Sequence, residues 1–424
     1  MASRYIRLSC YGSNVDPRDD DDEISAAVAL SLVPRKRKWG GSVPGHRVYK
    51  RDRAGADKRL MADYFVPRPL YNEDHFRRRF RMKQDLFLEV VNRTAAANPY
   101  FQKKPDCVGV EGFTPIHKCT VAIKMLANGG PADCLDDHLK MGESTVLETV
   151  KKFVETVIEV FGDEWLRPPT DEEVQHILQV NAARGFPGML GSIDCMHWEW
   201  ANCPTSHHGM YKGHKGKPTV ILEAAATEDL RIWHAFFGMP GSHNDINVLQ
   251  RSPVFDDLAN GRAPEVEFDV NGNTYSLGYY LADGIYPDWA TLVKSFGAPV
   301  NNKHTTFSER QESCRKDVER AFGVLQARWK IIRYAARLWS QLDLNAIMKA
   351  CIILHNMILA DERNSNLPHI ANEDWPGPRD PPVNNVAEMM DAYTYIKNKD
   401  TCFQLRDDLV EHIWQMKGTA GWDD

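Results

Sequence analysis

The stretch that decides the fold prediction is Met189-Leu190-Gly191-Ser192-Ile193-Asp194-Cys195-Met196-His197-Trp198-Glu199-Trp200, which follows Gly188. Its apolar and aromatic residues predict a β-strand. Asp194 stands in the middle of this strand, although an unpaired carboxylate is costly to bury. The strand therefore carries an acid that a simple core pattern does not explain.

More strands and then helices follow along the chain. Residues 219–226 and 231–237 have the composition of two strands joined by a short turn. Tyr279-Tyr280-Leu281-Ala282-Asp283 is a short buried strand that ends at Gly284. A helix is expected from Ser308, as its N-terminal cap, at least to Ile332, and another over residues 344–360. This order of elements predicts an α/β fold.

Two further acids occupy places that an amphipathic pattern does not predict. Asp283 ends the short strand, and Glu319 borders the apolar face of the long helix next to Val318. Each acid alone fits a loop cap or an arginine partner. Together with Asp194 they form a strand, strand, helix series of carboxylates, which are the hard oxygen ligands that Mg²⁺ or Mn²⁺ prefers. Two-metal phosphodiester cleavage needs such ligands on separate elements.

The residues before the strands are predicted to be helical. Apolar residues at a spacing of three and four begin near Leu86, and helices are expected over residues 115–127, over residues 133–141 and from Ser144. Short helices with glycine turns resemble a helix-turn-helix unit. The last helix carries Glu148, Glu155 and Glu159 against Lys151 and Lys152, so a scaffold role is favoured over sequence-specific DNA reading.

The two ends of the chain have a different composition. Residues 1–60 hold few large apolar residues and predict an unfolded arm, acidic at residues 19–23 and then basic. The arm is either simply solvated or a nuclear-import and phosphate-binding segment through Arg35, Lys36, Arg37 and Lys38. The predicted division is an arm at 1–60, a helical domain at 61–165, a catalytic domain at 166–363, and a Pro-rich linker with a final amphipathic helix at 364–424.

Bulk properties exclude several classes of protein. The net charge is −6 over 424 residues, so any nucleic-acid surface must be local. The nine cysteines form no CxxC pair, and no signal peptide opens the chain, which indicates a reducing intracellular compartment. No apolar run approaches the roughly 20 residues that a membrane helix needs, so no membrane association is expected.

Several ordered blocks resemble the PIF/Harbinger transposases, and the Pong-like plant transposon proteins in particular. The blocks are Gly191-Ser192-Ile193-Asp194-Cys195-Met196-His197, Pro240-Gly241-Ser242-His243-Asn244-Asp245, Leu281-Ala282-Asp283-Gly284-Ile285-Tyr286-Pro287 and Val318-Glu319-Arg320-Ala321-Phe322-Gly323-Val324-Leu325-Gln326. Shorter matches extend the likeness over about residues 35–362 and into the final helix.

The resemblance implies an RNase H-like core, a mixed sheet flanked by helices, after the helical region. It implies a catalytic, metal-binding triad of Asp194, Asp283 and Glu319, with 35 residues between the last two. The expected activity is metal-dependent cutting of transposon ends and joining of the 3′-OH to target DNA. The expected partners are DNA, a Myb-like DNA-binding protein and further copies of the chain, in the nucleus, or in the cytoplasm without the partner. A domesticated nuclear chromatin-binding or scaffold protein is the alternative.

Neighbouring residues leave other interpretations open. Asp245 and His197 are expected to support the triad rather than to belong to it. A zinc site is the chemical rival, because thiols and imidazoles are dense between residues 195 and 214: Cys195, His197, Cys203, His207, His208 and His214. The loop around residues 207–217 is equally a solvated hairpin tip or a loop beside the active site that contacts phosphates. The DNA-contact candidates beyond the basic arm are Lys212, Lys215, Lys217 and Arg320.

Overall fold

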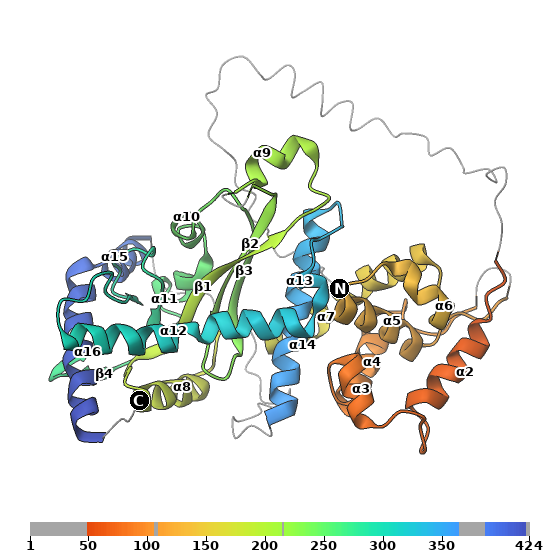
Figure 1. Ribbon diagram of the computed structural model, residues 1–424, viewed down its shortest axis with the longest axis horizontal. Helices are drawn as coiled ribbons and strands as arrows, with labels where there is room; N and C mark the ends of the chain where they lie inside the picture. Colours follow the sequence, from red (N-terminus) through yellow and green to blue (C-terminus); the bar gives the residue numbers. More distant parts are fainter. Residues whose placement is uncertain (1–48, 106–108, 214–215, 364–385, 421–424) are drawn as a thin grey trace, which may run out of the picture. The chain divides into compact units, whose positions relative to one another are not determined.

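The computed structural model describes residues 49–105, 109–213, 216–363 and 386–420. Figure 1 shows the helices and strands of this part of the chain. Residues Arg51–Asp424 make up one compact unit. The predicted basic residues Arg35, Lys36, Arg37 and Lys38, Lys215 in the loop and the Pro-rich stretch lie outside the described residues.

A bundle of helices comes first, as predicted. It comprises α2 (Arg53–Tyr64), α3 (Glu73–Phe80), α4 (Gln84–Ala97), α5 (Pro115–Asn128), η1 (Ala132–Leu135), α6 (Asp136–Leu139) and α7 (Glu143–Trp165). The Thr114 hydroxyl accepts a hydrogen bond from the backbone N–H of His117 at the start of α5, and Gly129 ends that helix at φ 62°. A side-chain N-cap and a left-handed glycine after the last turn are ordinary helix boundaries, which explains why the sequence predicted them closely.

The prediction of an unfolded arm through residue 60 is wrong at its end, because α2 begins at Arg53. Ala56, Leu60 and Tyr64 recur every four residues and are buried. Asp52 accepts a hydrogen bond from the backbone N–H of Gly55 and so caps the helix. The many charged residues between these three apolar positions hid a narrow helical stripe, which tertiary packing stabilises despite the low overall hydrophobicity.

A five-stranded mixed sheet follows in the order β3-β2-β1-β6-β7. Its strands are β1 (Met189–Glu199), β2 (Thr219–Ala226), β3 (Ile232–Pro240), β6 (Tyr279–Leu281) and β7 (Leu292–Val293), and β4 (Phe268–Val270) pairs separately with β5 (Asn273–Tyr275). The first three strands are antiparallel, whereas β6 lies parallel to β1 and to β7. The predicted strands are confirmed, but the two-residue β7 and the β4–β5 hairpin were too short to detect.

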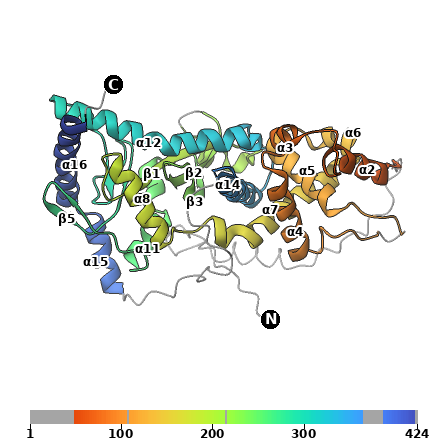
Figure 2. The same ribbon diagram turned by 90° about the horizontal axis from the view of Figure 1, so that it is seen from below.

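Helices cover both faces of this sheet. On one face, α12 (Asn302–Arg328) and α14 (Gln341–Arg363) share one hydrophobic core with β1, β2 and the N-terminal helices. On the other face, Ile193 packs into a smaller core with α11 (Asp256–Ala259) and α15 (Val386–Ile396). Figure 2 shows α12 and α11 on opposite sides of the strands. The remaining helices are α8 (Asp171–Ala183), η2 (Thr205–His207), α9 (His208–Tyr211), α10 (Asp245–Leu249), η3 (Pro253–Phe255), α13 (Lys330–Arg333) and α16 (Lys399–Ala420).

The boundaries of α12 differ from the prediction. Ser308 does not cap the helix: the Asn301 side chain accepts a hydrogen bond from the backbone N–H of His304, and the helix begins at Asn302. Ser308 instead accepts from the backbone N–H of Phe296 at 3.1 Å and fixes the preceding loop to the helix. The helix ends at Arg328, four residues before the predicted limit. Asparagine and serine are both good caps, so the sequence alone did not separate them.

Helix α14 is apolar and long enough to cross a membrane by length and composition alone, and 72% of its most apolar window is buried inside the protein. Its main packing partner is α7, followed by β3. The Asn356 side chain accepts from the backbone N–H of Ile232 at 3.0 Å and donates to two backbone carbonyls. These bonds tie α14 to the first residue of β3, so α14 is a core helix of this fold.

Candidate active site

Asp194 lies in the middle of the central strand. In the β1–β2 register it pairs with Ala224, and its side chain is 19% exposed. The backbone N–H of Cys195 donates to Asp194 Oδ1 at 2.8 Å. Two residues earlier, the Ser192 hydroxyl accepts from the backbone N–H of Val318 at 3.0 Å. This bond fastens β1 to the turn of α12 that carries Glu319.

A β-bulge at Gly191 sets the register of the strand beside this site. A Cβ on Gly191 would lie 2.6 Å from the backbone carbonyl oxygen of Ala226, and φ is +155°. The register of β1 against β6 also shifts between Met189 and Gly191. Bulges of this kind re-aim the side chains that follow them, and Asp194 is three residues further along.

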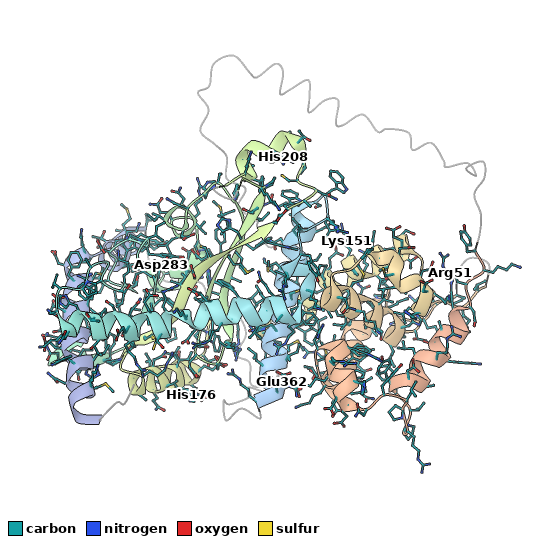
Figure 3. The ribbon with its side chains drawn as sticks, viewed as in Figure 1. Arg51, Lys151, His176, His208, Asp283 and Glu362 are labelled. Atoms are coloured by element: carbon teal, nitrogen blue, oxygen red, sulfur yellow. The ribbon has the colours of Figure 1, made fainter. Side chains whose placement is uncertain are left out.

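Asp283 follows the end of β6, the strand that pairs in parallel with the strand of Asp194. Ser192 pairs with Leu281 in the parallel register, so Asp194 and Asp283 each stand two residues beyond the same pair. Neighbouring strands are about 4.8 Å apart, which places the two backbones side by side. Asp283 is exposed, and the backbone N–H of Gly284 donates to its Oδ1. Figure 3 labels Asp283 in this part of the protein.

Arg315 connects the acids on α12 with the acid on β1. Its Nη1 lies 2.6 Å from Glu319 Oε1 and 3.6 Å from Asp194 Oδ2. Its Nη2 lies 3.0 Å from Glu312 Oε2, and Nε lies 3.2 Å from the same oxygen. The Arg315 side chain is 10% exposed. One guanidinium therefore faces three carboxylates from two elements.

Asp245, at the start of α10, is electrostatically coupled to the acids. The pKa of Asp194 is raised to about 6, mainly by burial and to a smaller extent by the charges of Asp245 and Glu319, against the lowering effects of the Cys195 N–H and Arg315. Burial also raises the pKa of Asp245, to which Asp283 adds a smaller effect. Glu319 and Asp245 thus act on Asp194, and Asp283 acts on Asp245. These four carboxylates therefore carry more negative charge than the nearby Arg315 neutralises.

The donor set fits Mg²⁺ or Mn²⁺ in its chemistry, because it consists of carboxylate oxygens from three elements. Within the described residues, no three His, Cys, Asp or Glu side chains already stand close enough to one another to hold a metal ion. Arg315 contacts two of the three acids, and Asp283 points its Oδ1 to a backbone N–H. A divalent cation would therefore require these side chains to rearrange.

Four residues of the zinc hypothesis have other contacts, and His214 lies outside the described residues. His197 Nδ1 lies 3.0 Å from Thr219 Oγ1, and Cys195 Sγ lies 3.5 Å from the Tyr286 hydroxyl. His208 Nε2 lies 2.9 Å from the backbone carbonyl oxygen of Cys203, a buried residue. Burial raises the pKa values of Cys195 and Cys203, which opposes the thiolate form that zinc binds. The contacts favour packing roles for these residues.

The basic loop lies at the far end of β1 from the acids. Lys217 pairs with Glu199 at 3.0 Å, and Lys212 is exposed and bridges to Pro218. Glu199 lies five positions beyond Asp194, which corresponds to about 16 Å along a strand. Figure 3 shows His208 of the same loop well apart from Asp283. The expectation that this loop adjoins the acids is therefore corrected to a position further along the sheet.

A shallow groove of about 530 Å³ runs along α12 and reaches Arg320, the residue after Glu319. It is lined by Ser295, Phe296, Ser308, Glu309, Glu312, Ser313, Lys316 and Arg320. Arg320 also pairs with Asp317, a buried carboxylate that Arg184 contacts at 2.8 Å. The groove therefore offers one exposed lysine and one partly engaged arginine next to Glu312, on the side of the helix that carries Arg315.

Arg315 is the site residue that sequence reasoning missed. Basic residues on a helix are ordinarily solvated, so the sequence alone does not distinguish Arg315 from its basic neighbours. The available signal was its spacing, because residues three and four apart share a helix face. Arg315 follows Glu312 by three residues and precedes Glu319 by four.

The sheet order and the helices on both faces define the class of the protein: an RNase H-like nuclease fold preceded by a helical region. Residues 163–366 match the family described as plant transposon protein, and this segment belongs to the Harbinger-type transposases. The resemblance found in the sequence is thereby confirmed. Residues 57–95 match a domain of unknown function.

Two relatives from Arabidopsis thaliana are similar to the chain. A protein named ALP1-like is 26% identical over 247 residues, which cover 57% of this chain and 60% of the relative. The protein named antagonist of like heterochromatin protein 1 is 24% identical over 250 residues, which cover 56% and 61%. The chain thus matches about three fifths of the length of these relatives. No solved structure matches.

Proposed function

We propose that this chain is a metal-dependent DNA endonuclease and transposase that cuts transposon ends and joins the 3′-OH to target DNA. The observation that carries the proposal is that the half-buried Asp194 of β1 shares Arg315 with Glu319 of α12 and stands level with Asp283 in the strand register. The Harbinger-type domain supports it, because it gives these acids a DNA-cutting context.

The proposed roles follow from the positions of the side chains. Asp194, Asp283 and Glu319 would hold Mg²⁺ or Mn²⁺, with Asp194 central because burial and two neighbouring acids raise its pKa. When bound, such ions supply charge stabilisation for the attacking and leaving oxygens of the phosphodiester. Asp245 acts on Asp194 through its charge, and His197, on the same strand as Asp194, contacts Thr219.

DNA would contact the protein through local basic residues, since the net charge of the chain is −6. Arg320 lies in the groove next to the acids, while Lys212 and Lys217 would contact DNA further along the sheet. We propose a Myb-like partner for recognition of the transposon ends, self-association of the chain, and action in the nucleus. We also propose that the helical and catalytic regions meet at residues 165 and 166, although they share one hydrophobic core.

The proposal is tested by incubating the purified chain and its Myb-like partner with a supercoiled plasmid that carries the transposon's terminal inverted repeats. Nicked and linear products should form with Mg²⁺ or Mn²⁺ and disappear with a chelator. Asp194→Asn, Asp283→Asn and Glu319→Gln should each reduce the rate at least 100-fold, because each removes a proposed ligand. Glu309→Gln on the same helix is the matched control. Cleavage that persists in Asp194→Asn would show that the site is misassigned.

The second candidate is a domesticated nuclear protein that binds chromatin without transposing. The name of one relative, antagonist of like heterochromatin protein 1, favours it. The same assay separates the two proposals. Saturable metal binding without any DNA cleavage in the presence of the partner would support the second candidate over the first.

A further inference from the structure

The positive charge nearest to the proposed metal ligands comes from the protein itself. The Arg315 guanidinium places Nη1 2.6 Å from Glu319 Oε1 and 3.6 Å from Asp194 Oδ2. Both acids are proposed ligands, and they come from different elements. Arginine keeps its charge under all ordinary conditions, so it is a permanent cation at this place.

Glu312 fixes the orientation of this guanidinium. It accepts from Nε and Nη2 of Arg315 at 3.2 and 3.0 Å, which holds one edge of the planar group. The opposite corner, Nη1, is thereby directed to Asp194 and Glu319. Because the Arg315 side chain is 10% exposed, these interactions are less screened than surface ion pairs. Glu312 therefore holds one side of the guanidinium, and the two proposed metal ligands, Asp194 and Glu319, face its other side.

We propose that Arg315 is a built-in counterion that occupies the cation position between Asp194 and Glu319, and that a divalent ion must displace its Nη1 to bind. This inference rests on the proposed function, because it assumes that the two acids are metal ligands. Arg315 keeps both acids near their working positions without metal, where like charges would otherwise push them apart. It also weakens metal affinity, since two cations compete for the same carboxylates.

The test measures Mn²⁺ binding to the metal-stripped full chain by isothermal titration calorimetry. Arg315→Gln should tighten Mn²⁺ binding at least fivefold, because it removes the competing charge. Arg315→Lys keeps a cation at the position and should remain within about twofold of the unsubstituted chain. Lys316→Gln makes the same change in net charge at an exposed neighbour and should also remain within about twofold.

A second measurement uses the unsubstituted chain and does not depend on the folding of Arg315→Gln. The ¹⁵N–¹H signal of Arg315 Nε, assigned by its loss in Arg315→Lys, should shift during a Mg²⁺ titration at the same concentrations that saturate the site. Equal Mn²⁺ affinities for Arg315→Gln and the unsubstituted chain, or an unmoved Nε signal, would overturn the counterion role and leave the metal site standing. Absence of saturable Mn²⁺ binding in every protein would overturn the metal site itself, and this inference with it.

Discussion

At the residue scale, Asp194 is a half-buried carboxylate whose negative charge the metal-free protein stabilises poorly. Its pKa is raised from 3.8 to about 6, mainly by burial and to a smaller extent by Asp245 and Glu319, while Arg315 lowers it. The folded state therefore binds the proton more tightly than the unfolded state. For such an acid, the stability cost appears as the pH rises above 3.8 and is complete above about 6.

Asp194→Asn should consequently stabilise the metal-free protein at neutral pH. The gain should be about 1–3 kcal/mol at pH 7.5, because one pKa unit corresponds to about 1.4 kcal/mol, and should vanish near pH 4. Urea unfolding in the presence of a chelator, at several pH values, measures it. Asp283→Asn removes an exposed carboxylate and should change the stability little. A destabilised Asp194→Asn protein at pH 7.5 would contradict the proposed strain on this acid.

The sequence singles out the three acids as candidates, but it does not place the positive charge between them. Asp194, Asp283 and Glu319 each broke a local pattern of apolar residues, and that irregularity is visible in one dimension. Arg315 breaks no pattern, because an arginine on a helix is ordinarily solvated. Its burial depends on β1 packing across α12, which is a tertiary contact that helical spacing does not contain.

At the element scale, the geometry of the candidate site depends on how β1 is held. The strand pairs with β2 on one edge and with β6 on the other, and Ser192 bonds to α12. The long strands were predicted because their apolar runs are long enough to give a periodic signal. The two-residue β7 and the bounds of α12 were not predicted, because they depend on pairing and loop contacts formed only in the fold.

Gly191→Ala should disturb this arrangement, because its Cβ would meet the backbone carbonyl oxygen of Ala226 at 2.6 Å. We expect a loss of about 1–3 kcal/mol, the usual cost of forcing extra volume into a packed site. The loss should come with weaker Mn²⁺ binding, since Asp194 follows the bulge. Gly323→Ala on α12 is the control: its Cβ would meet nothing within 4 Å. Alanine there should stabilise the helix by about 0.5–1 kcal/mol. Equal effects of the two substitutions on stability would argue against the role of the bulge.

At the scale of the whole molecule, the helical region and the sheet share one hydrophobic core. The core extends from Leu60 in α2 through α7 to Ile358 in α14, and it includes strand residues such as Leu222. Helix α7 belongs to the predicted helical domain, yet its main partner is α14, which follows the sheet in the chain. Sequence composition suggested a boundary at residue 165 because the periodicity changes there, whereas the packing joins the two sides.

A shared core predicts that the two regions unfold together. Phe153 on α7 is fully buried, so Phe153→Ala should cost about 3–5 kcal/mol. In differential scanning calorimetry, this loss should lower the midpoint of one transition whose calorimetric and van't Hoff enthalpies agree. Leu147→Ala on the same helix removes a side chain that is 44% exposed and should shift the midpoint far less. If Phe153→Ala instead splits the transition in two, with the later part at the unsubstituted midpoint, then α7 stabilises a separate domain, and the carboxylates of the sheet do not depend on the helical region for their placement.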